Sequence, residues 1–295
     1  MALIDLKISI LAIIKVEVKM KNILVGIDFS KGSLHALEYA INLANITISD
    51  ILMLWVDKQS DNESNHAFAE IDGYKDEASQ TITEIMETWT PKLKWGKLHY
   101  KIRKGKVYTE IAIQAKLSKS SYIITGTHER NGFDEFSVGD DAFKVVTSAP
   151  CPVITIHPNY GALNNFNHIL LPIDTTTFTM QKVPVIVELA GLLNSDIHVL
   201  GINGTGLTSL QKKVDDNVRK VEQLLREQKI TSTSEIIKNS DITHTILTYA
   251  EKIGAGLISV MTEQEPSQSS IMMGPQTQYI INMSEIPVLS IQPRK

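Results

Sequence analysis

The chain has 295 residues, more than the roughly 100–200 residues of a typical domain, so two domains are expected. Its 29 basic and 33 acidic residues give a net charge of −4, which argues against a general nucleic-acid surface and against a polybasic membrane patch. The single cysteine, Cys151, excludes an intrachain disulfide and is typical of a cytoplasmic protein. Because Cys151 lies between two prolines at the start of a predicted strand, a small buried side chain is favoured over a redox thiol.

Residues 1–20 are interpreted as an N-terminal extension. The apolar run at 8–14 is too short to span a bilayer, no basic segment precedes it, and no cleavage site of small residues follows it. We therefore expect a cytoplasmic chain without a membrane anchor. Residues 15–19 alternate apolar and charged side chains, so an added edge strand is the alternative to a dispensable extension.

An internal repeat sets the predicted architecture. The segment NILVGIDFS at 22–30 matches HILLPIDTT at 168–176, which lies 146 residues later in the chain. The segment CPVITI at 151–156 likewise matches IPVLSI at 286–291. The sequence therefore encodes two copies of one unit.

The repeat predicts two domains, 21–157 and 168–295, joined by a linker at 158–167 that is rich in Asn and Gly. In both, short apolar runs alternate with segments of helical period, which indicates an α/β fold with a parallel sheet. The first copy predicts strands at 22–28, 51–57, 97–103, 121–126 and 152–157, and helices at 31–46, 67–89, 107–118 and 140–148. The second predicts strands at 168–174, 196–202, 233–238, 256–261 and 287–292, and helices at 180–193, 208–228, 242–253 and 275–283. The fold class is thus two tandem five-stranded parallel domains of flavodoxin or Rossmann type.

The strongest functional signal lies at 121–157. An apolar strand ends at Gly126, a loop containing Gly132 and Gly139 follows, and a helix begins near Asp140. A strand that passes through a glycine-rich loop into a helix presents backbone N–H groups and a helix N-terminus, an arrangement that binds phosphate.

The motifs VGIDFS at 25–30, GTHERNG at 126–132, Gly139, and APCPV at 149–153 together resemble the universal stress proteins. The resemblance covers both copies and implies a tandem member with domains like those of the adenine nucleotide alpha hydrolases. Nucleotide-binding members of this family hold ATP with an Asp after the first strand, backbone of the second strand, and a Gly-x-x-Gly, nine residues, Gly-Ser/Thr pattern. By position, the resemblance implies a site made of Asp28, Val56, Gly126, position 129, Gly139 and position 140.

Two positions depart from that pattern, because Glu129 replaces a glycine and Asp140 replaces a serine or threonine. Both place a negative charge where phosphate would bind, and Asp140 would also cap the helix whose N–H groups face the phosphate. Each unfavourable charge pair at about 4 Å costs on the order of 4 kcal/mol at an effective dielectric constant of about 20. We therefore expect no certain cofactor, with ATP or AMP in the first domain as the alternative.

Other residues near this site have two interpretations each. Asp28 either contacts a ligand or caps the helix that begins near Lys31, with Ser30 assisting. His128 and Arg130 are interpreted as solvent-facing loop residues that could touch a ligand. Trp55, next to Val56, is interpreted as packing at the strand end in preference to stacking on a base.

The second copy departs further from the nucleotide-binding pattern of the family. Pro275 occupies the position of Asp140, and the segment MTEQEPSQSS at 261–270 replaces the glycine loop, although Asp174 still follows the first strand. No catalytic motif or metal-spaced His/Cys set is found in the sequence, so we expect neither an enzyme nor a metal site. Two functions remain: a stress-response regulatory or scaffold protein with a degraded nucleotide cradle, or an adenine-nucleotide-binding stress regulator that uses the first domain.

The resemblance also implies how the two copies associate. Homodimers of the family commonly pair through their last strands, so 152–157 and 287–292 are expected to join the copies as an internal pseudo-dimer. Both segments are short and apolar, the kind of sheet edge that otherwise needs protection. No nucleic-acid or membrane partner is expected, and the sequence does not identify any protein partner.

Overall fold

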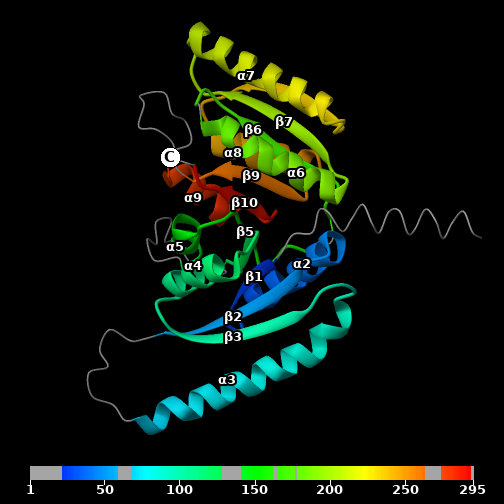
Figure 1. The fold of residues 1–295 in the computed structure, drawn as a ribbon. Helices are drawn as coiled ribbons and strands as arrows, with labels where there is room; N and C mark the ends of the chain where they lie inside the picture. Colours follow the sequence, from blue (N-terminus) through cyan, green and yellow to red (C-terminus); the bar gives the residue numbers. More distant parts are fainter. Residues whose placement is uncertain are drawn as a thin grey trace, which may run out of the picture.

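The computed structural model describes residues 22–58, 68–127, 141–161, 165–176, 178–262 and 274–293. These residues form a single ten-stranded sheet (Figure 1). The strands are β1 (Asn22–Ile27), β2 (Asp50–Lys58), β3 (Leu98–Gly105), β4 (Tyr122–Gly126), β5 (Val153–Ile156), β6 (His168–Ile173), β7 (Asp196–Asn203), β8 (Ser232–Lys238), β9 (Leu257–Met261) and β10 (Val288–Ile291). Their order across the sheet is β3-β2-β1-β4-β5-β10-β9-β6-β7-β8.

Each half of this sheet has the same strand order, and every pair of neighbouring strands within a half is parallel. The α/β class and the two five-stranded parallel units predicted from the sequence are therefore confirmed. The exact domain boundaries at 157 and 168 remain a prediction, because the sheet is continuous from one half to the other.

Helices cover both faces of the sheet (Figure 1). One face carries α2 (Lys31–Thr47), α3 (Phe68–Trp89), α6 (Val183–Leu193) and α7 (Thr208–Glu227). The other carries α4 (Val107–Ser118), α5 (Asp141–Ser148), α8 (Ile242–Lys252) and α9 (Gly274–Met283). Apolar spacing explains the packing: in α7, the buried residues Val214, Val218, Val221 and Leu225 recur at helical period and form one stripe.

The two halves join where β5 and β10 run antiparallel, with Val153 opposite Ser290 and Thr155 opposite Val288. This is the pairing expected between 152–157 and 287–292. One buried apolar cluster contains residues of both halves, so the core runs through the junction. The side-chain amide of Gln292 also donates to two carbonyls near the end of α5, those of residues 146 and 147, at 2.9 and 2.6 Å. The tandem domains therefore pair internally.

One predicted helix begins differently from expectation. The segment predicted as a helix at 180–193 starts as a 3-10 helix, η2 (Phe178–Lys182), and becomes α-helical only from Val183. Pro184 lies in the first turn of α6, where its missing N–H costs no hydrogen bond and its fixed φ suits a helix start. A second 3-10 turn, η1 (Thr90–Lys92), extends α3 beyond its predicted end.

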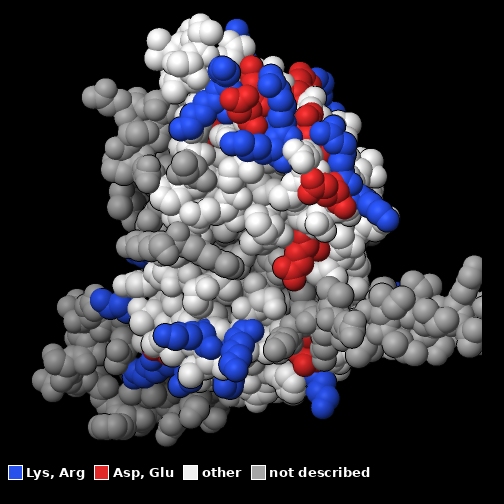
Figure 2. Space-filling model, turned by 45° about the horizontal axis from the view of Figure 1, so that its top comes forward, with Lys and Arg blue, Asp and Glu red and all other residues white. Residues whose placement is uncertain are grey.

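The exposed side of α7 carries charges of both signs. Figure 2 shows Lys and Arg side chains interspersed with Asp and Glu at the top of the molecule, where α7 lies. Arg219 and Asp216 form an ion pair there at 3.5 Å, with side chains 73% and 44% exposed. Such exposed pairs contribute at most about 1 kcal/mol each, so this surface is a solvated face and not a basic patch.

Candidate functional site

A cavity opens at the carboxyl ends of β1, β2 and β4 in the first half. In an open parallel sheet, ligands bind at this edge, where the chain leaves neighbouring strands toward opposite faces. Three residues predicted as site residues line the cavity, Asp28 after β1, Val56 in β2 and Gly126 at the end of β4. The structure thus brings these three together, around a volume of about 60 Å³. The full lining is Gly26, Ile27, Asp28, Ser30, Ser33, Leu54, Val56, Val107, Ile111, Thr125, Gly126, Ala142 and Val145.

Asp28 lies exposed beside the start of α2. One of its carboxylate oxygens, Oδ1, accepts hydrogen bonds from the Ser30 backbone N–H at 3.0 Å and from the Ser30 hydroxyl at 2.6 Å. The Ser30 hydroxyl oxygen in turn accepts from the N–H of Ser33 at 3.2 Å, so Ser30 is the N-cap of α2. The interpretation in which Asp28 itself caps this helix is therefore wrong, and Asp28 instead orients the residue that does.

Val56 lies just beyond the point where β1 stops pairing with β2. The last pair in that ladder joins Ile27 to Trp55, whereas Val56 pairs with Arg103 of β3. The side of Val56 that faces β1 consequently borders the cavity, not another strand.

Trp55 belongs to the opposite face of the sheet. Its ring stacks on Phe29, with centroids 6.0 Å apart and planes inclined by 19°, and it packs against the core on the face that carries α2. The interpretation of Trp55 as a packing residue at the strand end agrees with this contact.

Gly126 has a packing role as well as a place in the cavity wall. A Cβ at Gly126 would overlap the backbone carbonyl of Gly32 in α2, and a Cβ at Gly32 would lie 2.6 Å from the carbonyl oxygen of Thr127. Two glycines therefore let the end of β4 approach the first turn of α2 at backbone contact, as close packing of a strand end on a helix requires.

The remaining predicted site residues, His128, Arg130, Gly132, Gly139 and Asp140, lie outside the described residues, as does Glu129. The sequence interpretation, in turn, missed the contribution of α4. Val107 and Ile111 line the cavity from its first turns. Their spacing of four residues could have predicted this contribution, because it places both side chains on one face of a helix. That helix follows a strand of the sheet edge at which ligands bind.

The corresponding place in the second half is occupied by the protein's own polar groups. Asp174 follows β6 as Asp28 follows β1, but it is only 3% exposed. Its Oδ1 accepts from the N–H of Thr176 at 2.8 Å and from the Thr176 hydroxyl at 2.6 Å, and its backbone carbonyl accepts from the Asn217 amide at 2.9 Å. The Asp-x-Ser/Thr turn thus persists, whereas the carboxylate no longer faces solvent.

Lys182 adds a buried positive charge to this region. It is 1% exposed and lies at the position that Ala36 occupies in the first half, eight residues after the aspartate in both copies. Burial lowers the pKa of its ammonium group to about 8, although the nearby Asp174 carboxylate opposes that change. The second half therefore encloses an ammonium group and a carboxylate where the first half has a small side chain and an exposed acid.

These two related units also match a single family model twice. The model of the universal stress protein family matches residues 19–157 and again residues 165–292. The chain belongs to the universal stress protein family. The resemblance inferred from its motifs is thereby confirmed for both halves.

The chain is similar to one relative over about half of its length and to solved structures over nearly all of it. A universal stress protein of Methanocaldococcus jannaschii is 29% identical over 142 residues, covering 46% of this chain and 81% of the relative. A universal stress protein from Archaeoglobus fulgidus superposes with a TM-score of 0.73 at 18% identity, covering 93% of this chain and 97% of that structure. A putative universal stress protein from Pseudomonas aeruginosa superposes with a TM-score of 0.62, also at 18% identity. This match covers 93% of this chain and 94% of that structure. At such identities the structures establish the shared fold.

The structure also bears on redox and metal chemistry. Burial raises the pKa of the Cys151 thiol to about 12, so it is protonated at neutral pH and lacks the thiolate that redox chemistry requires. Among the described residues, no group of three or more His, Cys, Asp and Glu side chains is arranged to hold a metal ion. No helix in the described part of the chain is long and apolar enough to cross a bilayer.

Proposed function

We propose that this protein is a non-enzymatic stress-response regulator whose first domain holds an adenine nucleotide by its nucleoside end and whose second domain is structural. The family supports a role in the stress response. The observation that carries the rest is the cavity shared by Asp28, Val56 and Gly126 in the first domain.

Each of these residues suits one part of a nucleoside. An exposed carboxylate such as that of Asp28 accepts hydrogen bonds from ribose hydroxyls, and such charge-assisted bonds contribute about 1.5–3 kcal/mol. The backbone of Val56, beyond the β1 ladder, can pair with the edge of a base. The apolar side chains of Leu54, Val107 and Ile111 supply the wall that an aromatic base requires. At about 60 Å³ the cavity is smaller than a typical ligand site of roughly 300–1,000 Å³, so a bound nucleotide would extend beyond it.

The phosphate groups of a nucleotide are expected to contribute little to its binding free energy. Glu129 and Asp140 place carboxylates at the positions where family members that bind ATP have small residues. In the first turn of α2, the N–H of Ser33 is already bonded to the Ser30 hydroxyl, which leaves fewer donors for a phosphate there. We therefore propose that adenosine and AMP bind at least as strongly as ATP.

The two acids also favour a second candidate, in which the first cavity holds no nucleotide and the paired domains act as a scaffold. The continuous sheet and shared core supply a rigid platform for that role. The two candidates differ in one measurable respect, the binding of adenosine.

The test is calorimetric titration of the purified protein with adenosine, AMP and ATP, each with and without Mg²⁺, after mass spectrometry of any small molecule that copurifies. The proposal expects saturable binding of adenosine, weakened about tenfold or more by Asp28→Asn, because about 1.4 kcal/mol is a factor of ten. Asparagine can still accept from the Ser30 N–H, so the turn is kept. Asp241→Asn, which removes the same charge at the N-cap of α8, is the control and should leave binding unchanged. If no adenine compound binds, the nucleotide proposal fails and the scaffold candidate replaces it.

A further inference from the structure

Two histidines of the second half lie side by side at the amino ends of β6 and β7. His168 is the first residue of β6 and His198 is the third residue of β7. The register pairs His168 with Asp196 and Leu170 with His198. Because side chains alternate along a strand, His168, Asp196 and His198 all belong to the face that carries α8. Both histidines are partly exposed, so the face is open to ions in solution.

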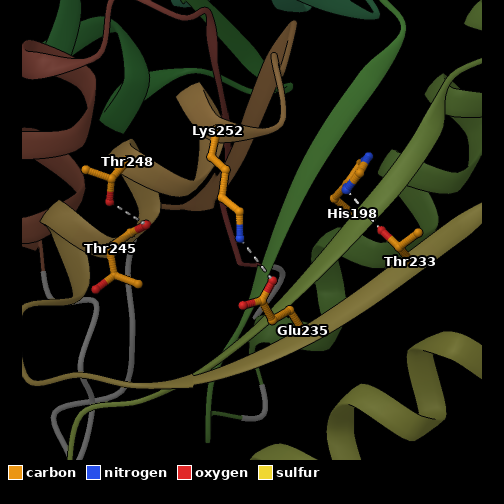
Figure 3. A network of polar contacts seen from close by, with 6 residues as sticks. All are labelled: His198, Thr233, Glu235, Thr245, Thr248 and Lys252. Carbon is orange, nitrogen blue, oxygen red and sulfur yellow. Dashed lines mark hydrogen bonds and ion pairs between the residues drawn. The ribbon is translucent and has the colours of Figure 1, made fainter.

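The two imidazoles meet nitrogen to nitrogen. His168 Nδ1 lies 3.4 Å from His198 Nε2, and the rings are nearly perpendicular, at 88° with centroids 5.1 Å apart. The other ring nitrogen of His198, Nδ1, lies 2.9 Å from the hydroxyl oxygen of Thr233 in β8 (Figure 3). When His198 donates its Nδ1–H to Thr233, its lone pair is at Nε2 and is directed toward His168.

This separation is the one that a tetrahedral metal ion requires. Zn²⁺ binds imidazole nitrogens at about 2.0–2.1 Å, and two such nitrogens at a tetrahedral angle are about 3.4 Å apart. Metal-binding histidines usually hold their other ring nitrogen in a hydrogen bond, which is the place of Thr233 here. We propose that His168 and His198 bind a Zn²⁺ ion between His168 Nδ1 and His198 Nε2.

A carboxylate on the same face favours a cation. Asp196 lies opposite His168 in the register of β6 and β7 and two residues before His198, so its side chain belongs to the face of the two imidazoles. Asp196 is the carboxylate on this face that can complete the coordination, with water in the remaining position. Its side chain must turn toward the metal, since no set of three metal-binding groups is already assembled among the described residues.

The second carboxylate of this face is engaged elsewhere. Glu235 of β8 lies 3.7 Å from the ammonium group of Lys252 in α8 (Figure 3). It also hydrogen-bonds to Tyr249 and so contributes, after burial, to raising the pKa of that phenol. These contacts direct Glu235 away from the histidine pair and leave Asp196 as the third ligand.

The pair belongs to the second domain alone. At the equivalent positions, 146 residues earlier, the first domain has Asn22 and Leu52, whereas Asp50 corresponds to Asp196. Neither Asn22 nor Leu52 provides a zinc ligand of imidazole type. The site therefore gives the second domain a ligand of its own, independent of any nucleotide in the first, and a bound ion would cross-link β6 to β7.

In the test, each histidine is replaced by the residue found at the equivalent position of the first domain. Full-length protein is titrated calorimetrically with Zn²⁺ at a pH near neutrality, and one site with a dissociation constant in the micromolar range is expected. His168→Asn and His198→Leu should each weaken binding at least tenfold, and together abolish it. Thr233→Val should weaken it about tenfold, since loss of such an outer hydrogen bond typically lowers metal affinity 10–100-fold. His244→Asn, at an exposed position of α8, is the matched control and should change nothing.

Co²⁺ gives a readout on the unaltered protein. Binding at this site should produce the intense visible absorption of tetrahedral Co²⁺, which excess Zn²⁺ should remove. Zn²⁺ binding that persists in the double variant, an octahedral Co²⁺ spectrum, or the absence of binding in the parent protein would each overturn the proposal.

Discussion

Gly126 and Gly32 meet backbone to backbone, so that a Cβ on Gly126 would overlap the Gly32 carbonyl. This contact joins the end of β4 to the first turn of α2 and sets one wall of the first-domain cavity. In the second half, the equivalent positions hold Met261, at the end of β9, and Phe178, 146 residues after Gly32. Because both of these residues carry a Cβ, the same backbone approach is excluded there, and the close contact belongs to the first domain alone.

Gly126→Ala should destabilise the protein by about 1–3 kcal/mol, because the added methyl group forces the strand end and the helix apart. Urea unfolding measures this change. Gly191→Ala is the control: this glycine lies exposed in α6, and an added Cβ would meet nothing within 4 Å, so the substitution should be neutral or stabilise by up to about 1 kcal/mol. If the two substitutions changed the free energy of unfolding equally, the backbone contact would not restrict the side chain at position 126.

Two buried serines predict opposite effects of one substitution. Ser290 lies at the junction of the halves, 1% exposed, and its hydroxyl has no hydrogen-bond partner among the described residues. Ser259 is fully buried and donates to the carbonyl of Leu170 at 3.0 Å. Ser290→Ala should therefore be neutral or stabilise by about 1 kcal/mol, whereas Ser259→Ala should destabilise by a similar amount. Denaturant unfolding of both variants checks the signs, and a destabilised Ser290→Ala would mean that its hydroxyl is satisfied.

Lys182 predicts a specific dependence of stability on pH. Its pKa is about 8 in the folded protein and about 10.4 in an unfolded chain. Between these values the unfolded chain binds more protons, so the free energy of unfolding rises with pH as this group deprotonates in the folded state. From about pH 7 to about pH 9.5 the gain is on the order of 2 kcal/mol.

Lys182→Met removes this contribution, while Cys151 and the buried tyrosines titrate alike in both proteins. The difference in unfolding free energy, parent minus variant, should therefore increase over that pH range. Parallel curves would show that the Lys182 ammonium group is solvated.

The two acidic positions of the first-domain loop supply a gain-of-function prediction. Glu129→Gly with Asp140→Ser removes two carboxylates from the positions expected to face phosphate, and should strengthen ATP binding more than tenfold while adenosine binding stays nearly constant. Calorimetry with both ligands measures the two effects separately. Pro275→Ser, the matching change in the second domain, should leave ATP binding unchanged. Micromolar binding of ATP by the parent protein would contradict the charge argument.

The sequence predicted the arrangement of the cavity better than the details of its walls. Asp28 follows β1, Gly126 ends β4 and Val56 lies near the end of β2, and the carboxyl ends of parallel strands meet at one edge, so their proximity followed from the pattern. The choice of Ser30 over Asp28 as the helix cap did not, because both residue types are good caps and only the geometry of the turn distinguishes them.

The sequence by itself determined the α/β class and the duplication, because these depend on local periodicity and on repeated motifs that one chain displays in full. The family resemblance of the sequence predicted the pairing of β5 with β10. Only the tertiary structure decided the burial of Lys182 near Asp174, the contact of Gly32 with Gly126, and the meeting of His168 with His198. Each of these joins residues from different elements, and their separation depends on strand register and helix packing, which side-chain spacing along the chain does not specify.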